Sequence, residues 1–381
     1  MSIVQAARLS RAPIAGLAAV GVFWGGFAAL SPDIKAAAGA SDQQYGFALL
    51  MASVGGMVAM YLGPRVVAAL GHRVLPLAAA LLVMAFAYPA LAYDMPTLAV
   101  AMFGMGVSVA TLDISSNVRI SALESHHKVH LMNLNHAMFS FAFAGSAFLT
   151  SLARKEGWDA GQVMPALALI AVALLLVMIE RTPWEAETEQ AHKPGADLPW
   201  TPIVMAAAIL FAAFVCENAT EAWSALHIER TLGAAHGTGG FGPMMLGLTM
   251  GFGRLGGQLV AEKVGEARLI MISALVGVVG ALVIAWAPNE AVALTGVGLL
   301  GFGVAVMVPS ANSILGHMVP KSLRGYAISR AWLFGFTGFF LGPTLMGFVS
   351  EQVGLRWAFV MIAGFMAAIV PLVLEMRRRG G

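Results

Sequence analysis

The chain has 381 residues, of which 59% are hydrophobic and only 11% charged, with a formal net charge of +2. A soluble domain carries about a quarter charged residues, so this composition excludes a soluble globular protein. The small charge, without a basic patch interleaved with aromatics, argues against a nucleic-acid partner. The single cysteine, Cys216, excludes an internal disulfide and a cysteine metal cluster.

Continuous apolar stretches follow one another along the whole chain. A bilayer core needs about 20 apolar residues per helix, and the stretches do not alternate as the strands of a barrel would. We therefore expect an all-α polytopic membrane protein, surrounded by membrane lipid, with twelve spans. They are 13–34, 45–68, 74–93, 95–121, 132–153, 162–180, 201–225, 240–261, 268–287, 291–317, 326–350 and 356–375.

Lysine and arginine gather on one side of these spans. If the N-terminus is cytoplasmic, the outer side holds only Lys35, Arg154, Lys155, Arg230 and Arg356. The positive-inside rule then predicts a multi-pass protein of the cytoplasmic (inner) membrane with both termini in the cytoplasm. The first span is longer than the core of a signal peptide and is followed by others, so we expect it to be retained.

Two similar halves are indicated by the sequence. The only long polar stretch separates two sets of six spans, and Gly63 and Gly71 recur with the same spacing as Gly257 and Gly265. Such repeats place a substrate site near the midplane between the halves. The predicted parts are an N-terminal six-helix bundle at 1–181, a cytoplasmic linker at 182–200 and a C-terminal six-helix bundle at 201–381.

Ionisable residues inside membrane spans are costly and are therefore functional candidates. Asp113 is the first, and Asn117 lies one helical turn away on the same face. The next span runs back antiparallel, so we expect His136 level with Asn117 and Asn133 nearer the cytoplasm. Together these groups can exchange protons and bind hydroxyls. The alternative is a structural polar cluster that joins the two helices.

A second pair of acids occurs in the seventh span. Glu217 lies in the outer half of the membrane, and Glu221 follows at the i+4 position, where like charges repel. Glu221 either contributes to the site or lies at the membrane surface, the favoured interpretation. Trp223 either anchors the helix in the interfacial aromatic belt, the favoured interpretation, or gates the site. Arg330 either extends to the membrane surface, again favoured, or binds an anionic solute.

Two further positions are candidates for substrate contact. Trp24, beside the pair Gly25 and Gly26, can form a stacking platform for a sugar ring, although small residues more often allow helices to pack closely. Asn312 follows Pro309, where a broken helix can expose carbonyl groups to substrate. Neither a Walker sequence nor a convincing metal-ligand set is present, so the sequence predicts no cofactor and no bound metal.

A short sequence motif near the predicted eighth span indicates a resemblance to a known family. The stretch 253–257 (GRLGG) followed by 262–265 (EKVG) resembles the cytoplasmic loop motif of the major facilitator superfamily, and the chain resembles that family over essentially its whole length. The resemblance implies two six-helix bundles that move by alternating access. It also implies that Arg254, Glu262 and Lys263 form a conformational loop, with Arg254 pairing across the interface between the halves.

More specific strings resemble the L-fucose:proton symporter branch and its YbjJ-type bacterial relatives. They are 112–117 (LDISSN), 132–139 (MNLNHAMF) and 217–225 (ENATEAWSA). The branch has a proton-carrying aspartate in its first helix, whereas this chain has Pro32 at that place. The resemblance therefore supports proton coupling through the fourth helix more than through the first.

We interpret the chain as a secondary active transporter, not an enzyme, that acts as a monomer and moves a small polar, sugar-like molecule with protons. Asp113 and Glu217 are the expected proton carriers. The expected substrate contacts are Trp24, Asn117, Asn133, His136, Glu221 and Asn312. The alternatives are proton-coupled export of amphipathic compounds, suggested by the many methionines and phenylalanines, and a membrane receptor that does not transport.

Overall fold

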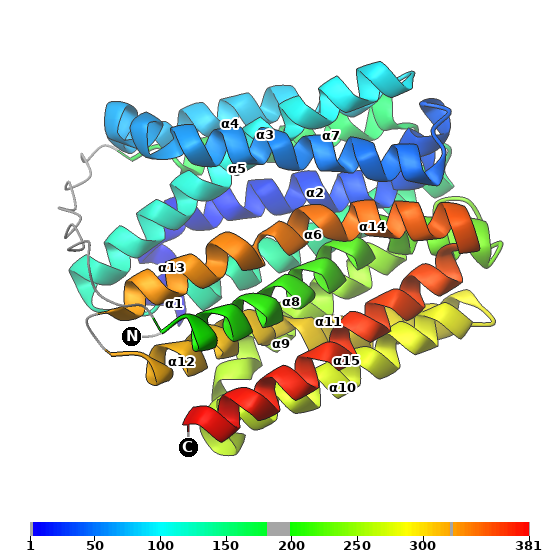
Figure 1. Ribbon diagram of the computed structural model, residues 1–381. Helices are drawn as coiled ribbons and strands as arrows, with labels where there is room; N and C mark the ends of the chain where they lie inside the picture. The colour runs from blue at the N-terminus through cyan, green and yellow to red at the C-terminus, as the bar shows by residue number, and fades with distance from the viewer. Residues whose placement is uncertain (1–2, 181–198, 321–322, 381) are drawn as a thin grey trace.

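The computed structural model describes residues 3–180, 199–320 and 323–380, and every regular element in these ranges is helical. Long helices lie side by side in one bundle (Figure 1). The N-terminal helix and the end of the C-terminal helix lie at the same end of this bundle, on the left in Figure 1. We call it the terminal end and the opposite one the far end.

The first half begins with a short helix that precedes the first span. The third span is a helix extended by a short 3-10 segment, and the fourth continues six residues beyond its predicted end at 121, so that Arg119 lies inside it. The elements are α1 Ile3–Leu9, α2 Arg11–Ala37, α3 Asp42–Leu70, η1 Gly71–Arg73, α4 Val74–Ala85, η2 Tyr88–Leu91, α5 Met95–His127, α6 Met132–Lys155 and α7 Ala160–Val177.

The second half has two interrupted spans. The tenth breaks at Val306 and the eleventh at Phe336, while residues 182–198 of the predicted linker lie outside the described residues. The elements are α8 Trp200–Leu226, the π-helical η3 His227–Thr231, α9 Phe241–Val264, α10 Glu266–Trp286, α11 Glu290–Ala305, α12 Met307–Met318, α13 Arg324–Gly335, α14 Thr337–Val353 and α15 Leu355–Gly380.

The predicted membrane-spanning architecture is confirmed. Within the described residues, eleven helices or in-line helix pairs are long and apolar enough to cross a bilayer. The twelfth span is α9, which connects two of them and coincides with the predicted stretch 240–261.

Helix starts at the far end have local chemical causes. Ser41, Asp94 and Asp159 each accept a hydrogen bond from the backbone N–H three residues later, and that residue's side chain bonds back to the cap. These capping boxes satisfy N–H groups that have no partner in the first helical turn. They therefore fix where α3, α5 and α7 begin.

Glycines let the helices approach closely. An added Cβ on Gly25 of α2 would overlap the carbonyl of Phe143 in α6, and one on Gly106 of α5 would overlap the carbonyl of Ala52 in α3. The glycine pair in α2 thus serves helix packing, the simpler of its two interpretations. The halves meet where α6 packs on α9 and where α3 packs on α14.

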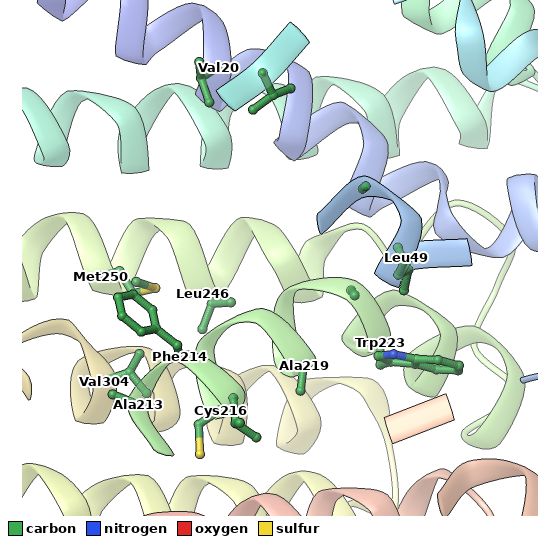
Figure 2. Close-up of a cluster of buried hydrophobic side chains, with 14 of the residues drawn as sticks. Val20, Leu49, Ala213, Phe214, Cys216, Ala219, Trp223, Leu246, Met250 and Val304 are labelled. Atoms are coloured by element: carbon green, nitrogen blue, oxygen red, sulfur yellow. The ribbon is translucent and has the colours of Figure 1, made fainter. Parts of the chain in front are cut away.

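The helix α8 runs through the interior of the second half. Most of its residues are buried, including Ala213, Cys216, Ala219 and Trp223. Figure 2 shows these side chains together with Leu246 of the neighbouring α9. Because α8 is enclosed on nearly every side, its two glutamates lie inside the protein and not toward lipid, which makes them central to the site.

Candidate functional site

Three predicted side chains form a chain of contacts between α5 and α6. The amide Nδ2 of Asn117 lies 3.3 Å from Oδ2 of Asp113 and 2.9 Å from its backbone oxygen. The Oδ1 of Asn117 lies 3.1 Å from Nε2 of His136. The helical spacing and the antiparallel course of α6 predicted these neighbours, and the structure brings all three together.

This series of polar contacts continues into the second half through Arg254 of α9. Its Nη1 donates to Oγ of Ser140 at 2.7 Å, and its Nη2 donates to Oε1 of Glu217 at 3.1 Å. Ser140 is on α6 and in turn donates to the backbone oxygen of His136 at 3.0 Å. Polar contacts therefore run from Asp113 in one half to Glu217 in the other.

This placement corrects the expectation for Arg254. The loop motif grouped it with Glu262 and Lys263, but its guanidinium contacts Glu217 and Ser140 a full ten residues before the end of α9. The hydroxyl partner lies across the interface, whereas the acid lies in the same half. Lys263 is exposed, and the side chain of Glu262 lies outside the described part of the structure.

A small cavity lies beside this series of polar contacts, where α6 of the first half meets α8 and α9 of the second. Its volume is about 10 Å³, room for about one water molecule. It is lined by Phe139, Ser140, Phe143, Glu217, Glu221, Leu246, Gly247 and Met250. The two carboxylates thus line a small space whose other walls include aromatic and methionine side chains.

Glu221 therefore lies inside the protein, and the favoured interpretation of it as a residue of the membrane surface is wrong. Its carboxylate has no hydrogen bond or ion pair with any of the described residues. An unpaired carboxylate in a water-poor interior is costly. Among the described residues, Glu221 is consequently the acid of this cavity that lacks a paired cation or hydrogen-bond donor.

A larger cavity opens on the terminal side of Arg254. Its volume is about 210 Å³, enough for a small organic molecule. It is lined by Asn133, Arg254, Gly257, Ala261, Glu266, Ala305, Val306, Pro309 and Ser310. Arg254 stands between the two spaces, because it lines the larger one while bonding Ser140 and Glu217 of the smaller.

Two predicted substrate contacts lie elsewhere. Trp24 packs edge to face between Phe23 and Phe27, with ring centroids 5.5 Å from each. Asn312 accepts a hydrogen bond from Nε1 of Trp332 at 3.2 Å. Neither side chain is among those lining the two cavities. The helix break predicted near Asn312 is present at the junction of α11 and α12.

The favoured interpretation of Trp223 as a surface anchor is wrong. Its side chain is fully buried, its Nε1 donates to the carbonyl of Pro343 at 3.0 Å, and its ring meets Tyr45 edge to face. It therefore ties α8 to α14 and α3. Arg330 lies against Tyr326 of its own helix, with the guanidinium 4.6 Å from the ring centroid.

Charged contacts between the halves at the far end were not predicted from the sequence. Arg154 of α6 is fully buried and forms ion pairs with Asp33 of α2 and Glu229 of η3, both at 2.6 Å. A second set joins Asp42 of α3 to Arg230, at 2.5 Å, and to Ser350. The far end is closed by these contacts, while the larger cavity lies toward the terminal end.

The residues that form these charged contacts at the far end were only weakly indicated by the sequence. The sequence placed Arg154 and Arg230 on the outer side, but nothing in their spacing showed which partner each would find. Ser140 was also missed, although it lies one turn after His136 in α6. Pairing of this kind depends on how six helices on each side meet, which sequence separation does not encode.

The protein is a helical membrane protein with buried charged contacts between two halves. A cavity lies toward one end, and ion pairs close the other. This combination is typical of a membrane transporter. The profile of the Major Facilitator Superfamily matches residues 14–299 and 225–380. The chain belongs to this superfamily. Its members are transporters, and the protein is not an enzyme.

Similar proteins span nearly the whole chain. An uncharacterized MFS-type transporter of Yersinia pestis is 24% identical over 345 residues, covering 88% of each chain. Membrane protein MosC of Rhizobium meliloti is 24% identical over 358 residues, covering 92% of this chain and 86% of MosC. An uncharacterized transporter of Sinorhizobium fredii is 26% identical over 378 residues, with 97% and 98% covered.

Solved structures share the fold. The inward-open xylose transporter XylE of E. coli matches with a TM-score of 0.77 at 14% identity, covering 99% of this chain and 96% of that one. The nucleoside transporter NupG matches with a TM-score of 0.72 at 13% identity, covering 97% and 99%. At such low identity these likenesses show a shared fold and nothing more.

Proposed function

We propose that this protein is a secondary active transporter that moves a small polar solute together with protons by alternating access. The observation that carries the proposal is the continuous set of polar contacts from Asp113 to Glu217, which crosses the interface between the halves. A movement of one half relative to the other must change these contacts, because Arg254 bonds Ser140 in the first half and Glu217 in the second. Relatives named as a xylose transporter and a D-xylose-proton symporter support a polar, sugar-like solute and proton coupling.

The proposed moving units are the two bundles, residues 1–181 and 201–381, joined by the linker at 182–200. With both termini in the cytoplasm, as the distribution of lysine and arginine predicts, the terminal end faces the cytoplasm. The larger cavity then lies on the cytoplasmic side and the ion-paired far end faces outward. We accordingly assign the structure to the inward-facing conformation. We also propose that the protein acts as a monomer in the inner membrane.

Asp113 and Glu217 are the proposed proton carriers. A carboxyl within a membrane span is costly to leave charged, so protonation and binding of a positive partner are its two stable states. Asn117, His136 and Asn133 contribute amide and imidazole groups toward the solute or hold Asp113 in place. The strings 112–117 in α5, 132–139 in α6 and 217–225 in α8 support a relation to the L-fucose:proton symporter branch.

The test is proton movement in proteoliposomes that contain a pH-sensitive dye, screened with sugars, sugar acids and amphipathic amines. A solute-dependent pH change that Asp113→Asn abolishes, with the variant still monodisperse, supports the proposal. A pH change driven only by amphipathic amines would favour the exporter alternative. Solutes that bind but move neither themselves nor protons would overturn transport in favour of a receptor.

A further inference from the structure

The guanidinium of Arg254 is only partly satisfied by the protein. An arginine carries five N–H donors in a planar fork, and two of them have acceptors among the described residues, Ser140 and Glu217. The side chain is 18% exposed and lines the 210 Å³ cavity. The remaining donors are therefore available to a group in that cavity, and the fork shape matches a carboxylate.

The rest of the cavity wall offers a different chemistry. Asn133 and Ser310 present neutral polar groups, and Glu266 has a buried Oε2 without a hydrogen-bond donor among the described residues. A carboxylate oxygen of this kind accepts from a hydroxyl group. The cavity thus provides a cation at one place and hydrogen-bonding groups at others, within a volume suited to a molecule of monosaccharide size.

A carboxylate entering this cavity competes with Glu217 for the same guanidinium. Glu217 has its ion pair with Arg254 and no other hydrogen bond or ion pair among the described residues. Once displaced, it shares a space of about 10 Å³ with Glu221, one helical turn away. Among the described residues, the other titratable groups around the network and its cavities are Asp113 of α5, His136 of α6 and Glu266 of α10.

Once displaced, Glu217 has no other cation paired with it among the described residues, and an unpaired carboxylate in a water-poor interior is costly whatever the state of Glu221. The displaced Glu217 therefore takes up one proton, forming one O–H bond, while the ion pair of Arg254 passes to the solute carboxylate. The solute contributes one negative charge and the proton one positive charge. Their sum is zero, so the loaded protein has the same net charge as the empty one.

We infer that the transported solute is a small hydroxylated organic anion, which binds Arg254 in place of Glu217, and that one proton accompanies it on Glu217. The inference rests on the proposed function and narrows it in three ways. It names the solute class, it describes the exchange that couples solute to proton, and of the two proposed carriers it assigns the coupled proton to Glu217, with Asp113 keeping the same protonation state in the empty and loaded protein. It also gives Arg254 a role in solute binding instead of in the cytoplasmic loop.

The experiment compares gluconate, glucose and glucosamine in proteoliposomes that report internal pH. Gluconate should enter with protons, and an imposed potassium diffusion potential should leave its initial rate unchanged. Glucose or glucosamine moving with protons where gluconate does not would overturn the anion inference and leave the proposed function standing. An absence of proton movement with these three solutes and with the whole panel used to test the proposed function would overturn both.

Variants separate the roles of the two charged residues. Glu217→Gln mimics the protonated acid, so gluconate counterflow should continue while proton-driven accumulation is lost. Arg254→Gln should weaken gluconate binding by about tenfold or more, since a hydrogen bond to a charged group is removed. The control is Arg65→Gln, because Arg65 is exposed and contacts Tyr61 of its own helix.

The outcome can contradict each role. If Glu217→Gln still accumulates gluconate with protons, Glu217 does not carry the proton. If Arg254→Gln binds gluconate as the unmodified protein does, Arg254 is not the anion site. Size-exclusion chromatography of each variant shows whether a loss of transport reflects a loss of folding, and Glu217→Gln remains informative where Arg254→Gln fails to fold.

Discussion

Replacing Arg154 with methionine should open the far end of the protein. Arg154 makes two hydrogen bonds to Asp33, two to Glu229 and one to the backbone oxygen of Ala29. Of these, the pair with Glu229 connects the two halves. Methionine keeps much of the buried length of the side chain but removes the charge that joins them.

The magnitude follows from burial. Removing one partner of a buried ion pair costs about 3–5 kcal/mol, and Arg154 is fully buried, with Glu229 11% exposed. Glu229 keeps hydrogen bonds from the backbone N–H groups of Gly237 and Gly239, which lessens the cost. We expect the closed state to lose about 2–3 kcal/mol relative to the open one, a roughly 30- to 150-fold change in their ratio.

The assay measures the distance between spin labels on the two halves at the far end. Glu156 and Pro288 are both exposed there and suit labelling after substitution by cysteine, since Cys216 is buried. Arg154→Met should shift the distances toward longer values. Arg356→Met is the control, because Arg356 bonds the backbone of Ala285 within its own half.

An unchanged distance distribution in Arg154→Met would refute the assignment of this ion pair as a closing contact. An equal shift in Arg356→Met would show that loss of any arginine at this end has the same effect. The conservative Arg154→Lys should restore part of the closed population, because lysine keeps the charge but not the bidentate geometry.

Three further outcomes test the packing and the caps. Gly106→Ala should lower the melting temperature strongly, because its Cβ would overlap the backbone of the facing helix, whereas Gly145→Ala meets nothing within 4 Å and should be neutral or slightly stabilising. Trp223→Phe should cost about 1 kcal/mol in unfolding free energy, from the lost N–H bond to the backbone of α14, and unchanged stability would contradict that bond's contribution. The hydroxyl and backbone N–H of Thr97 hold the pKa of the Asp94 carboxyl below its ordinary value. The stabilisation from this cap is therefore present at neutral pH and lost as pH falls through about 4 and below, and Asp94→Asn should remove that part of the pH dependence of melting.

Within the site, the predictable contacts were the local ones. Asp113 and Asn117 are four residues apart on one helix, and His136 follows from the antiparallel return of the next. The environment of Trp223 was assigned incorrectly, because an aromatic residue near a helix end occurs both at membrane surfaces and in helix interfaces. Only the packing of α8 against α14 and α3 distinguishes the two.

The sequence by itself determined that this protein crosses a membrane twelve times. Hydrophobic length is a local property, and every backbone group in lipid must be bonded within its own helix, so the spans can be read directly. The tertiary structure alone decided that Arg254 joins Ser140 to Glu217 and that Arg154 joins Asp33 to Glu229. These contacts connect helices distant in the chain, and each partner was selected by the relative position of whole helices, which no local pattern specifies.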